Sequence, residues 1–382
     1  METHRIFLPD GHQKLDVSYI PPQLPHREEH IKLILEALGP LMEAPAETFF
    51  PPLLHGPTGT GKTSSMKKAA KKIREGVKKR IILHYVHVPC SVFTKSYSVV
   101  QKISEGITSA PPRGLGGEEL LSRVYGELET RDEYLLLVLD DVDELIKRDR
   151  GRLLFMITRL EEGGGFRERR VFPTLIMRKW RILRAIPPAV RSKITGLRVE
   201  FQPYNAVEMA SIVRQRVKLA FQPGVITPNT IKQISFNGAA LGGGDARYAL
   251  ALLNGSAHVA LRMGTNKIEV EHARRAQQEF DKKPSSGVVE RADRFGLAAL
   301  MAAAKCFRDN PDKYTVSIGE IYGVFQEVAR KINVEARPRR ELAQKLYDMC
   351  DAGILHRVEG KIVLSNPSAE TLYDRVLKLI YE

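Results

Sequence analysis

The chain has 382 residues, of which 43% are apolar and 27% charged, and this composition excludes a disordered polypeptide and predicts a globular protein of two or three domains. Three widely spaced cysteines (Cys90, Cys306 and Cys350) exclude a disulfide framework, and no apolar run reaches the roughly 18 residues of a membrane span, so we expect a protein of the reducing cytoplasm. The net charge of +14 predicts a polyanionic partner, with nucleic acid as the leading candidate.

The start of the chain carries few structural signals. Residues 1–14 are expected to form an extended arm, and several prolines prevent a helix until Pro25 can open one. From residue 27 to residue 41, apolar positions recur at helical spacing. One face of this helix should therefore pack on a core.

The strongest motif occupies residues 56–63. An apolar stretch at 49–54 precedes it and a helix-forming stretch begins at residue 64, which is the strand–loop–helix setting of a phosphate-binding P-loop. The glycines allow backbone N–H groups to face phosphates at the positive end of the helix dipole, while Lys62 reaches phosphate oxygens and Thr63 binds Mg²⁺. The candidate residues for ATP or ADP are Gly56, Pro57, Thr58, Gly59, Thr60, Gly61, Lys62, Thr63 and Ser64.

The helix before the P-loop strand lies where many nucleotide-binding ATPases line their adenine pocket. His26 and Arg27 are therefore either neighbours of the nucleotide or an exposed helix start, and the sequence leaves both readings open.

Strands and helices then alternate. Residues 80–88 predict a buried parallel strand, and residues 92–107 and 118–128 predict helices. Between the two helices, residues 108–117 form a turn-rich insert that presents Arg113.

A second motif with chemical meaning occupies residues 134–141, an apolar run that ends in two carboxylates. Such a strand is typical of ATPases in which the first acid lies near Mg²⁺ and the second polarises the attacking water. We assign Asp140 to the metal and Asp141 to the water. Asp141 is one methylene shorter than the glutamate usual at this position, so we expect slow hydrolysis.

The chain continues as an α/β protein and then becomes helical. Residues 171–177 predict a strand, a strongly basic segment follows, and helical periodicity begins at residue 206. A glycine cluster at 242–244 opens a helix with Arg247 in its first turn, where the γ-phosphate would supply the anion that this arginine needs. The order of elements predicts a parallel α/β ATPase core followed by a small helical domain, which is the layout of an AAA+ ATPase.

The last hundred residues predict a winged-helix domain. A polar, proline-containing linker at residues 281–287 separates them from the helical domain, and 15 basic residues nearly balance 14 acidic ones over 285–382. DNA binding and protein docking therefore both remain open. Three helices and a β-pair are predicted at residues 289–307, 318–332, 338–350, 354–358 and 361–364. The candidate DNA contacts near the third helix and in the wing are Arg337, Arg339, Arg340, Lys345 and Lys361.

Five motifs together resemble the archaeal origin-recognition family, the initiators related to the eukaryotic origin recognition complex. They are Leu-Pro-His-Arg-Glu at 24–28, the P-loop, Leu-Asp-Asp-Val-Asp at 139–143, Phe-Gln-Pro-Tyr-Asn at 201–205 and Gly-Asp-Ala-Arg at 244–247.

This resemblance implies an AAA+ P-loop core with a parallel sheet at residues 1–204, a helical lid and linker at 205–284, and a winged-helix DNA-binding domain at 285–382. It also implies ATP-dependent binding to duplex origin DNA, recruitment of the replicative helicase, other initiator subunits as partners, and a nucleoid-associated protein without membrane contact.

The resemblance also assigns roles to single residues. Arg247 corresponds to the lid arginine called sensor 2, and Tyr204 joins the candidate nucleotide contacts. Arg113 and Gly114 fall in the insert that presses on the DNA backbone. Arg191 lies in the region that supplies an arginine finger to a neighbouring subunit.

Three departures from the family pattern concern hydrolysis. Arg178 stands at or near the place of a polar sensor, Ala189 replaces a common arginine, and Asp141 replaces glutamate. They suggest a divergent paralogue that binds ATP and hydrolyses it slowly or not at all.

Two other functions share these parts. A nucleotide-gated transcription regulator would need the same ATP and DNA sites, and a branch-migration motor would need rapid hydrolysis in a closed ring. The weakened set of water-positioning residues argues against the motor.

Overall fold

The computed structural model describes residues 6–43, 49–108, 114–163, 165–166, 168–194, 196–280 and 289–381. The chain forms two compact units, one of Pro22–Pro203 and one that joins Met1–Pro21 to Tyr204–Glu382. The N-terminal segment therefore groups with the C-terminal part of the chain, which differs from the expected core of residues 1–204. No described helix is long and apolar enough to cross a membrane.

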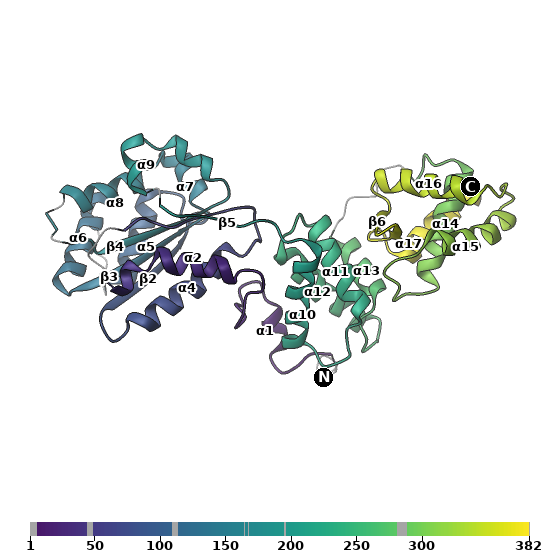
Figure 1. The fold of residues 1–382 in the computed structure, drawn as a ribbon, viewed down its shortest axis with the longest axis horizontal. Helices are drawn as coiled ribbons and strands as arrows, with labels where there is room; N and C mark the ends of the chain where they lie inside the picture. Colours follow the sequence, from purple (N-terminus) through teal and green to yellow (C-terminus); the bar gives the residue numbers. More distant parts are fainter. Residues whose placement is uncertain are drawn as a thin grey trace. The chain divides into compact units, whose positions relative to one another are not determined.

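The Pro22–Pro203 unit is built on a five-stranded sheet (Figure 1). The strands lie in the order β2-β3-β4-β1-β5, and all neighbours are parallel. Parallel neighbours require crossover connections, which helices provide here. The strands are β1 (Leu53–His55), β2 (Ile82–Pro89), β3 (Glu133–Asp140), β4 (Val171–Met177) and β5 (Arg198–Glu200). The helices are α2 (Glu28–Ala37), α3 (Pro40–Glu43), α4 (Lys62–Val77), α5 (Ser96–Ile107), α6 (Gly117–Thr130), α7 (Val142–Asp149), α8 (Arg152–Gly163), η2 (Trp180–Ala185) and α9 (Pro188–Ile194).

The interior strand β3 explains why this sheet has helices on both faces. Leu135, Leu137 and Leu139 are fully buried in one apolar cluster, which includes side chains of α5 to α9. Leu136 and Val138 are fully buried in a second cluster with side chains of α2 and α4. Because successive strand residues point to opposite faces, the continuous apolar run fills both layers.

The other unit contains the lid and the winged-helix domain. Its lid helices pack around one apolar cluster, and the winged-helix domain has its own. The N-terminal and lid helices are α1 (Gly11–Leu15), α10 (Ala206–Ala220), α11 (Pro228–Ala240), α12 (Ala246–Arg262) and α13 (Val270–Phe280). The winged-helix elements are α14 (Arg294–Arg308), α15 (Ile318–Lys331), α16 (Arg339–Asp351), β6 (His356–Val358), β7 (Lys361–Val363) and α17 (Ala369–Tyr381).

The N-terminal segment packs on the lid helices instead of extending as an arm. Helix α1 contacts α10, and Phe7 and Phe221 form a β-bridge with their rings stacked 4.8 Å apart. Arg216 of α10 is buried and donates a hydrogen bond to the carbonyl of Tyr19 at 2.9 Å. The expectation of an extended arm is therefore wrong for residues 6–14, because apolar burial and a buried guanidinium hold this segment on the lid, while residues 1–5 of the expected arm lie outside the described residues.

The winged-helix domain has the three predicted helices and the antiparallel β-pair. An additional helix, α17, was not predicted from the sequence. It packs on α14 and buries Leu372 and Val376 in the domain's apolar cluster. Helix α15 begins at Ser317, which forms a reciprocal capping box with Glu320.

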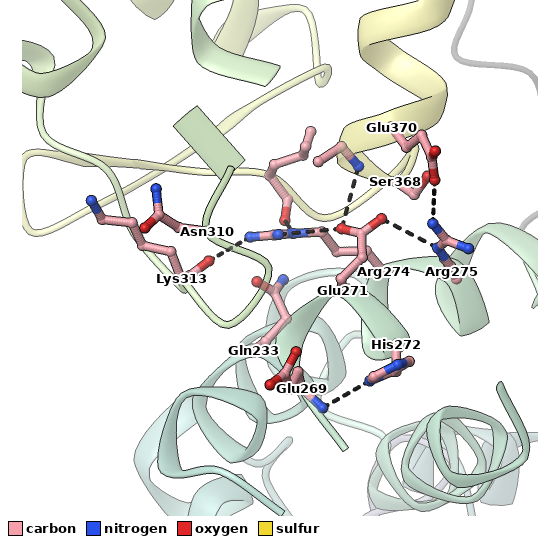
Figure 2. Close-up of polar contacts among 12 residues, drawn as sticks. Gln233, Glu269, Glu271, His272, Arg274, Arg275, Asn310, Lys313, Ser368 and Glu370 are labelled. Carbon is pink, nitrogen blue, oxygen red and sulfur yellow. Dashed lines mark hydrogen bonds and ion pairs between the residues drawn. The ribbon is translucent and has the colours of Figure 1, made fainter. Parts of the chain in front are cut away.

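A buried arginine joins the lid to the winged-helix domain (Figure 2). Arg274 of α13 is fully buried and donates hydrogen bonds to the carbonyls of Leu364 at 2.9 Å and Lys313 at 2.7 Å. Its guanidinium lies 3.5 Å from the carboxylate of Glu271 and 4.5 Å from the ring centroid of Phe307. One side chain thus links α13 to two separate segments of the winged-helix domain, and the two domains belong to one compact unit.

Candidate nucleotide-binding site

Three turns of the chain meet at the carboxyl edge of the sheet. The P-loop follows β1, Asp140 ends β3, and Arg178 follows β4. Because β4 pairs in parallel with both β3 and β1, the carboxyl ends of all three strands lie at one edge. Open parallel sheets bind ligands beyond these ends. The two strongest sequence motifs therefore converge where a ligand site is expected.

The P-loop conformation depends on its glycines. Gly56, Gly59 and Gly61 have φ angles of 143°, 68° and 89°, a region that residues with side chains rarely adopt. A Cβ atom at Gly56 would also lie 2.1 Å from the carbonyl oxygen of Phe201. Gly61 caps α4, whose first N–H groups and positive dipole end suit a bound phosphate.

The Lys62 side chain lies within the loop. Its buried ammonium donates hydrogen bonds to the carbonyls of Gly56 at 2.7 Å and Pro57 at 2.6 Å. The hydroxyl of Thr60 donates to the same Pro57 carbonyl at 2.9 Å. A phosphate oxygen would be a stronger partner for this ammonium than either carbonyl, because both groups would then be charged.

The P-loop and the acidic strand end are in direct contact. Thr63 donates its hydroxyl hydrogen to Oδ2 of Asp140 at 2.7 Å, and His87 of β2 lies 3.0 Å from the same oxygen. The backbone N–H of Asp141 donates to the other oxygen, Oδ1, at 3.0 Å. Burial raises the pKa of Asp140, but the hydrogen bonds from His87 and Thr63 outweigh it and lower the pKa below the usual value. Asp140 is therefore ionised at neutral pH.

Asp141 has a different environment. It adopts a left-handed conformation, with φ of 52°, and precedes α7. Burial, followed by the negative charge of Asp140, raises the pKa of its carboxyl above the usual value. Arg178 opposes this shift, with its Nε 3.9 Å from Oδ1 of Asp141. Arg178, at or near the expected sensor position, thus pairs with Asp141, which we assigned to the attacking water.

These donors fit a magnesium nucleotide. Thr63 and Asp140 offer hydroxyl and carboxylate oxygens, the hard ligands that Mg²⁺ prefers, and Lys62 and the start of α4 offer N–H donors to phosphate. Among the described residues, no group of three or more His, Cys, Asp or Glu side chains could hold a metal ion. Mg²⁺ commonly takes only one or two protein ligands and completes its shell with phosphate and water.

Arg27 connects the P-loop to the end of the unit. It is 3% exposed, and it donates hydrogen bonds from Nε to the carbonyl of Thr60 at 2.8 Å and from Nη2 to the carbonyl of Gln202 at 2.9 Å. The reading of an exposed helix start is therefore wrong for Arg27, whereas His26 is exposed in the turn before α2. The buried guanidinium supports the loop through backbone carbonyls that the sequence pattern does not identify.

Other predicted residues lie elsewhere. Arg191 is on α9, which packs on α8 and η2. Gly114 is exposed in the insert with a φ of 84°, while Arg113 lies outside the described residues. Arg247 and Tyr204 belong to the other unit, where Arg247 pairs with Asp245 at 3.2 Å and Tyr204 is buried in the lid's apolar cluster.

The basic residues of the winged-helix domain differ in their environment. Arg337 lies 4.7 Å from the ring centroid of Phe295, and Lys345 pairs with Asp293 at 2.8 Å, so both have partners within the domain. Arg337 is also exposed, as are the remaining three at the start of α16 and in the wing: Arg339, Arg340 and Lys361. These three side chains are the better placed to meet an external partner.

Two polar residues at this edge were missed as site residues. Asp143 is buried and accepts the backbone N–H groups of Arg178 at 2.8 Å and Lys179 at 3.3 Å, which ties α7 to the end of β4. His87 contacts Asp140 although 53 residues separate them. The sequence signal that could have identified His87 is its position near the end of β2, because neighbouring parallel strands end at the same edge of a sheet.

Three domain families match successive parts of the chain. The AAA domain matches residues 51–172, the Cdc6 AAA+ ATPase-type lid domain matches 210–278, and the CDC6 C-terminal winged helix domain matches 288–362. Together with the parallel sheet, these matches confirm the predicted fold of an AAA+ core, a helical lid and a winged helix.

Curated relatives match over most of their length. The ORC1-type DNA replication protein 1 of Sulfurisphaera tokodaii is 32% identical over 341 residues, covering 88% of this chain and 83% of that protein. The ORC1-type DNA replication protein 1 of Archaeoglobus fulgidus is 28% identical over 349 residues, covering 89% of this chain and 82% of that protein.

Solved structures agree with these matches. Cdc6p from Pyrobaculum aerophilum has a TM-score of 0.86 at 23% identity, covering 98% of this chain and 99% of that chain. The Aeropyrum pernix ORC1 protein, solved in complex with DNA, has a TM-score of 0.64 at 25% identity, covering 98% of this chain and 97% of that chain.

Proposed function

Because the chain belongs to the family of ORC1-type DNA replication proteins, we propose that it is a nucleotide-binding replication initiator that binds duplex DNA at an origin. The resemblance read from five sequence motifs agrees with this membership. The observation that supports the proposal is the contact between Thr63 of the P-loop and Asp140 of β3, the two groups proposed to hold Mg²⁺, in the unit that matches the AAA domain.

The nucleotide is proposed to be ATP or ADP with Mg²⁺. Lys62 and the N–H groups after Gly61 would bind the phosphates, and Thr63 with Asp140 would hold the cation. The burial of Lys62 and Asp140 and the family's AAA domain support these assignments. Arg247 is proposed as the sensor 2 arginine on the family resemblance alone.

DNA binding is proposed for the winged helix and for the insert of the AAA+ unit. Arg339, Arg340 and Lys361 are exposed on α16 and the wing, where winged-helix proteins enter a groove or touch the backbone. The Aeropyrum pernix ORC1 protein was solved in complex with DNA, which supports DNA as a partner of this chain. We keep residues 205–284 as lid and linker and 285–382 as the DNA-binding domain, and we add the N-terminal segment to the lid, on which it packs.

Recruitment of the replicative helicase and slow hydrolysis are the finer parts of the proposal. Asp141 is shorter than glutamate and lies 3.9 Å from Arg178, an arrangement that leaves its carboxylate partly occupied. Bound ATP would then act as a conformational clamp. Multiple turnover at about 1 s⁻¹ or faster, an ordinary enzymatic rate, would refute slow hydrolysis.

A genome-wide selection tests the initiator function. The purified chain is incubated with ATP and sheared DNA of its own organism at near-physiological salt, and the retained DNA is sequenced. We expect enrichment at one or a few intergenic loci with repeated sites beside a replication start. Enrichment over many promoters would instead indicate a transcription regulator, and uniform retention would indicate charge-driven, non-specific binding.

A further inference from the structure

His87 is a hydrogen-bond partner of Asp140. It belongs to none of the sequence motifs. It lies on β2, whose register with β3 sets Pro89 opposite Asp140. Its Nε2 is 3.0 Å from Oδ2 of Asp140, and both side chains are mostly buried, with exposed fractions of 20% and 11%. The contact therefore forms in a partly desolvated place, where such an interaction is strong.

The direction of this hydrogen bond follows from chemistry. A carboxylate side chain is ordinarily ionised at neutral pH, and an ionised carboxylate only accepts hydrogen bonds. Nε2 of His87 must therefore carry the hydrogen and donate it. The same reasoning makes Thr63 the donor in its contact with Oδ2.

The hydrogen bonds of Asp140 leave few acceptor sites open. A carboxylate has about four lone-pair sites, two on each oxygen. Oδ2 accepts from Thr63 and His87, so both of its sites are taken, whereas among the described residues Oδ1 accepts only the N–H of Asp141. Thr63 donates its hydrogen to Asp140, which leaves the oxygen lone pairs of its hydroxyl available to a cation.

We propose that His87 is a positioning residue of the magnesium nucleotide site. By occupying the second site on Oδ2, it fixes the Asp140 carboxylate so that Oδ1 keeps the open acceptor site and the Thr63 oxygen is left for the cation. His87 does not touch the cation itself. The inference rests on the proposed nucleotide site and adds to it the residue that orients its acidic group. Outer-shell partners of this kind are typical of metal sites.

The chain offers a matched control on the same strand. His84 of β2 pairs with Glu133 at 2.7 Å and is 28% exposed, so it forms a similar histidine–carboxylate contact. Glu133 begins β3, whereas Asp140 ends it. A substitution of His84 should therefore remove a histidine–carboxylate contact from this strand without altering the carboxyl edge of the sheet.

The test measures nucleotide affinity by calorimetry on the full chain, with ADP and Mg²⁺ and with ADP in EDTA. We expect His87→Phe to weaken Mg·ADP binding about 10-fold to 100-fold, as is typical for loss of an outer-shell partner, and to leave metal-free ADP binding unchanged. His87→Gln retains an N–H donor at the end of its side chain and should bind close to wild type. His84→Phe should behave as wild type.

Several outcomes would overturn the inference. If His87→Phe binds Mg·ADP with wild-type affinity, the contact with Asp140 does not contribute to nucleotide binding. If His87→Gln loses as much Mg·ADP affinity as His87→Phe, an N–H donor at this position is not what the site requires. If His87→Phe does not fold, pulsed electron paramagnetic resonance of Mn²⁺·ADP on the wild-type chain still decides, because a directly bound imidazole nitrogen would contradict a positioning role. Absence of ADP binding to the wild-type chain under both conditions would instead refute the nucleotide site, and this inference with it.

Discussion

Replacing Arg274 by methionine should destabilise the unit that contains the lid and the winged helix. Arg274→Met retains an unbranched apolar stem but removes the charge and all N–H donors of the guanidinium. Burial lowers the pKa of Arg274 to about 10, and Glu271 opposes this shift, so the guanidinium is charged at neutral pH. The substitution would leave the carbonyls of Leu364 and Lys313 without this donor in a buried interface (Figure 2).

The magnitude follows from these contacts. Removing one partner of a buried ion pair costs about 3 to 5 kcal/mol, and a buried carbonyl that loses its donor costs about 1 to 3 kcal/mol. These terms are not additive, and Arg275 would still lie 3.4 Å from Glu271. We therefore expect a loss of about 3 to 5 kcal/mol in the free energy of unfolding of this unit.

Urea denaturation can separate the two units of the chain. The single tryptophan, Trp180, lies in η2 of the Pro22–Pro203 unit, so its fluorescence follows that unit, while far-ultraviolet circular dichroism follows the helices of both. With a denaturant slope of about 1 to 3 kcal/mol per molar, Arg274→Met should move the transition of the lid and winged-helix unit roughly 1 to 5 M lower in urea. The fluorescence transition should move much less.

Arg275→Met is the matched control, because Arg275 is the next residue on α13 and also pairs with Glu271, but its side chain is 31% exposed. Ion pairs with this exposure contribute about 0 to 1 kcal/mol. Equal destabilisation by the two variants would refute the reasoning that burial of the guanidinium sets the cost. An unchanged circular dichroism transition in Arg274→Met would refute the role of this residue in joining the two domains.

Three further predictions concern the nucleotide site, the DNA interface and acid stability. Lys62→Ala should weaken ATP binding about 10-fold to 150-fold, the range for one lost charged hydrogen bond, and unchanged affinity by calorimetry would contradict the P-loop assignment. Arg339→Ala with Arg340→Ala should weaken duplex binding by about 1 to 3 kcal/mol if these residues read bases, or flatten the salt dependence if they contact phosphates; unchanged affinity at low and high salt would exclude them as contacts. In Glu320, the hydrogen bonds from Lys313 and Ser317 lower the pKa from 4.5 to about 2, so its stabilisation is present above pH 4.5 and is lost as pH falls toward 2. Glu320→Gln should therefore destabilise α15 at pH 7 by no more than about 1 kcal/mol, because the contact is largely exposed. Below pH 4.5 the destabilisation should be smaller. If the difference in urea midpoint between wild type and Glu320→Gln does not shrink on acidification, this prediction is contradicted.

The sequence was sufficient to predict those features that are formed by residues adjacent in the chain. The P-loop could be recognised because its glycines, its lysine and the following helix are contiguous, and the structure has the expected strand, loop and helix at that place. The apolar run that ends at Asp140 was likewise sufficient to predict a strand with an acidic residue at its end. The winged helix followed from the order and spacing of its elements.

Partners that are distant in the chain could not be predicted in this way. Arg27 and Gln202 are 175 residues apart, and Arg274 and Leu364 are 90 apart, yet both arginines are buried and bound to backbone carbonyls. A backbone carbonyl has no signature in the sequence, because every residue has one. For the same reason the sequence left Arg27 open between a neighbour of the nucleotide and an exposed helix start, and did not predict its backbone partners.

The sequence by itself determined the local chemistry of this protein: a phosphate-binding loop, an acidic strand end, a lid and a winged helix. Only the tertiary structure decided which side chains meet at the carboxyl edge of the sheet, that His87 donates to Asp140, and that the N-terminal segment packs on the lid. The physical reason is that periodicity and turn signals depend on residues a few positions apart, whereas the pairing of strands and the burial of charges depend on the packing of the whole chain.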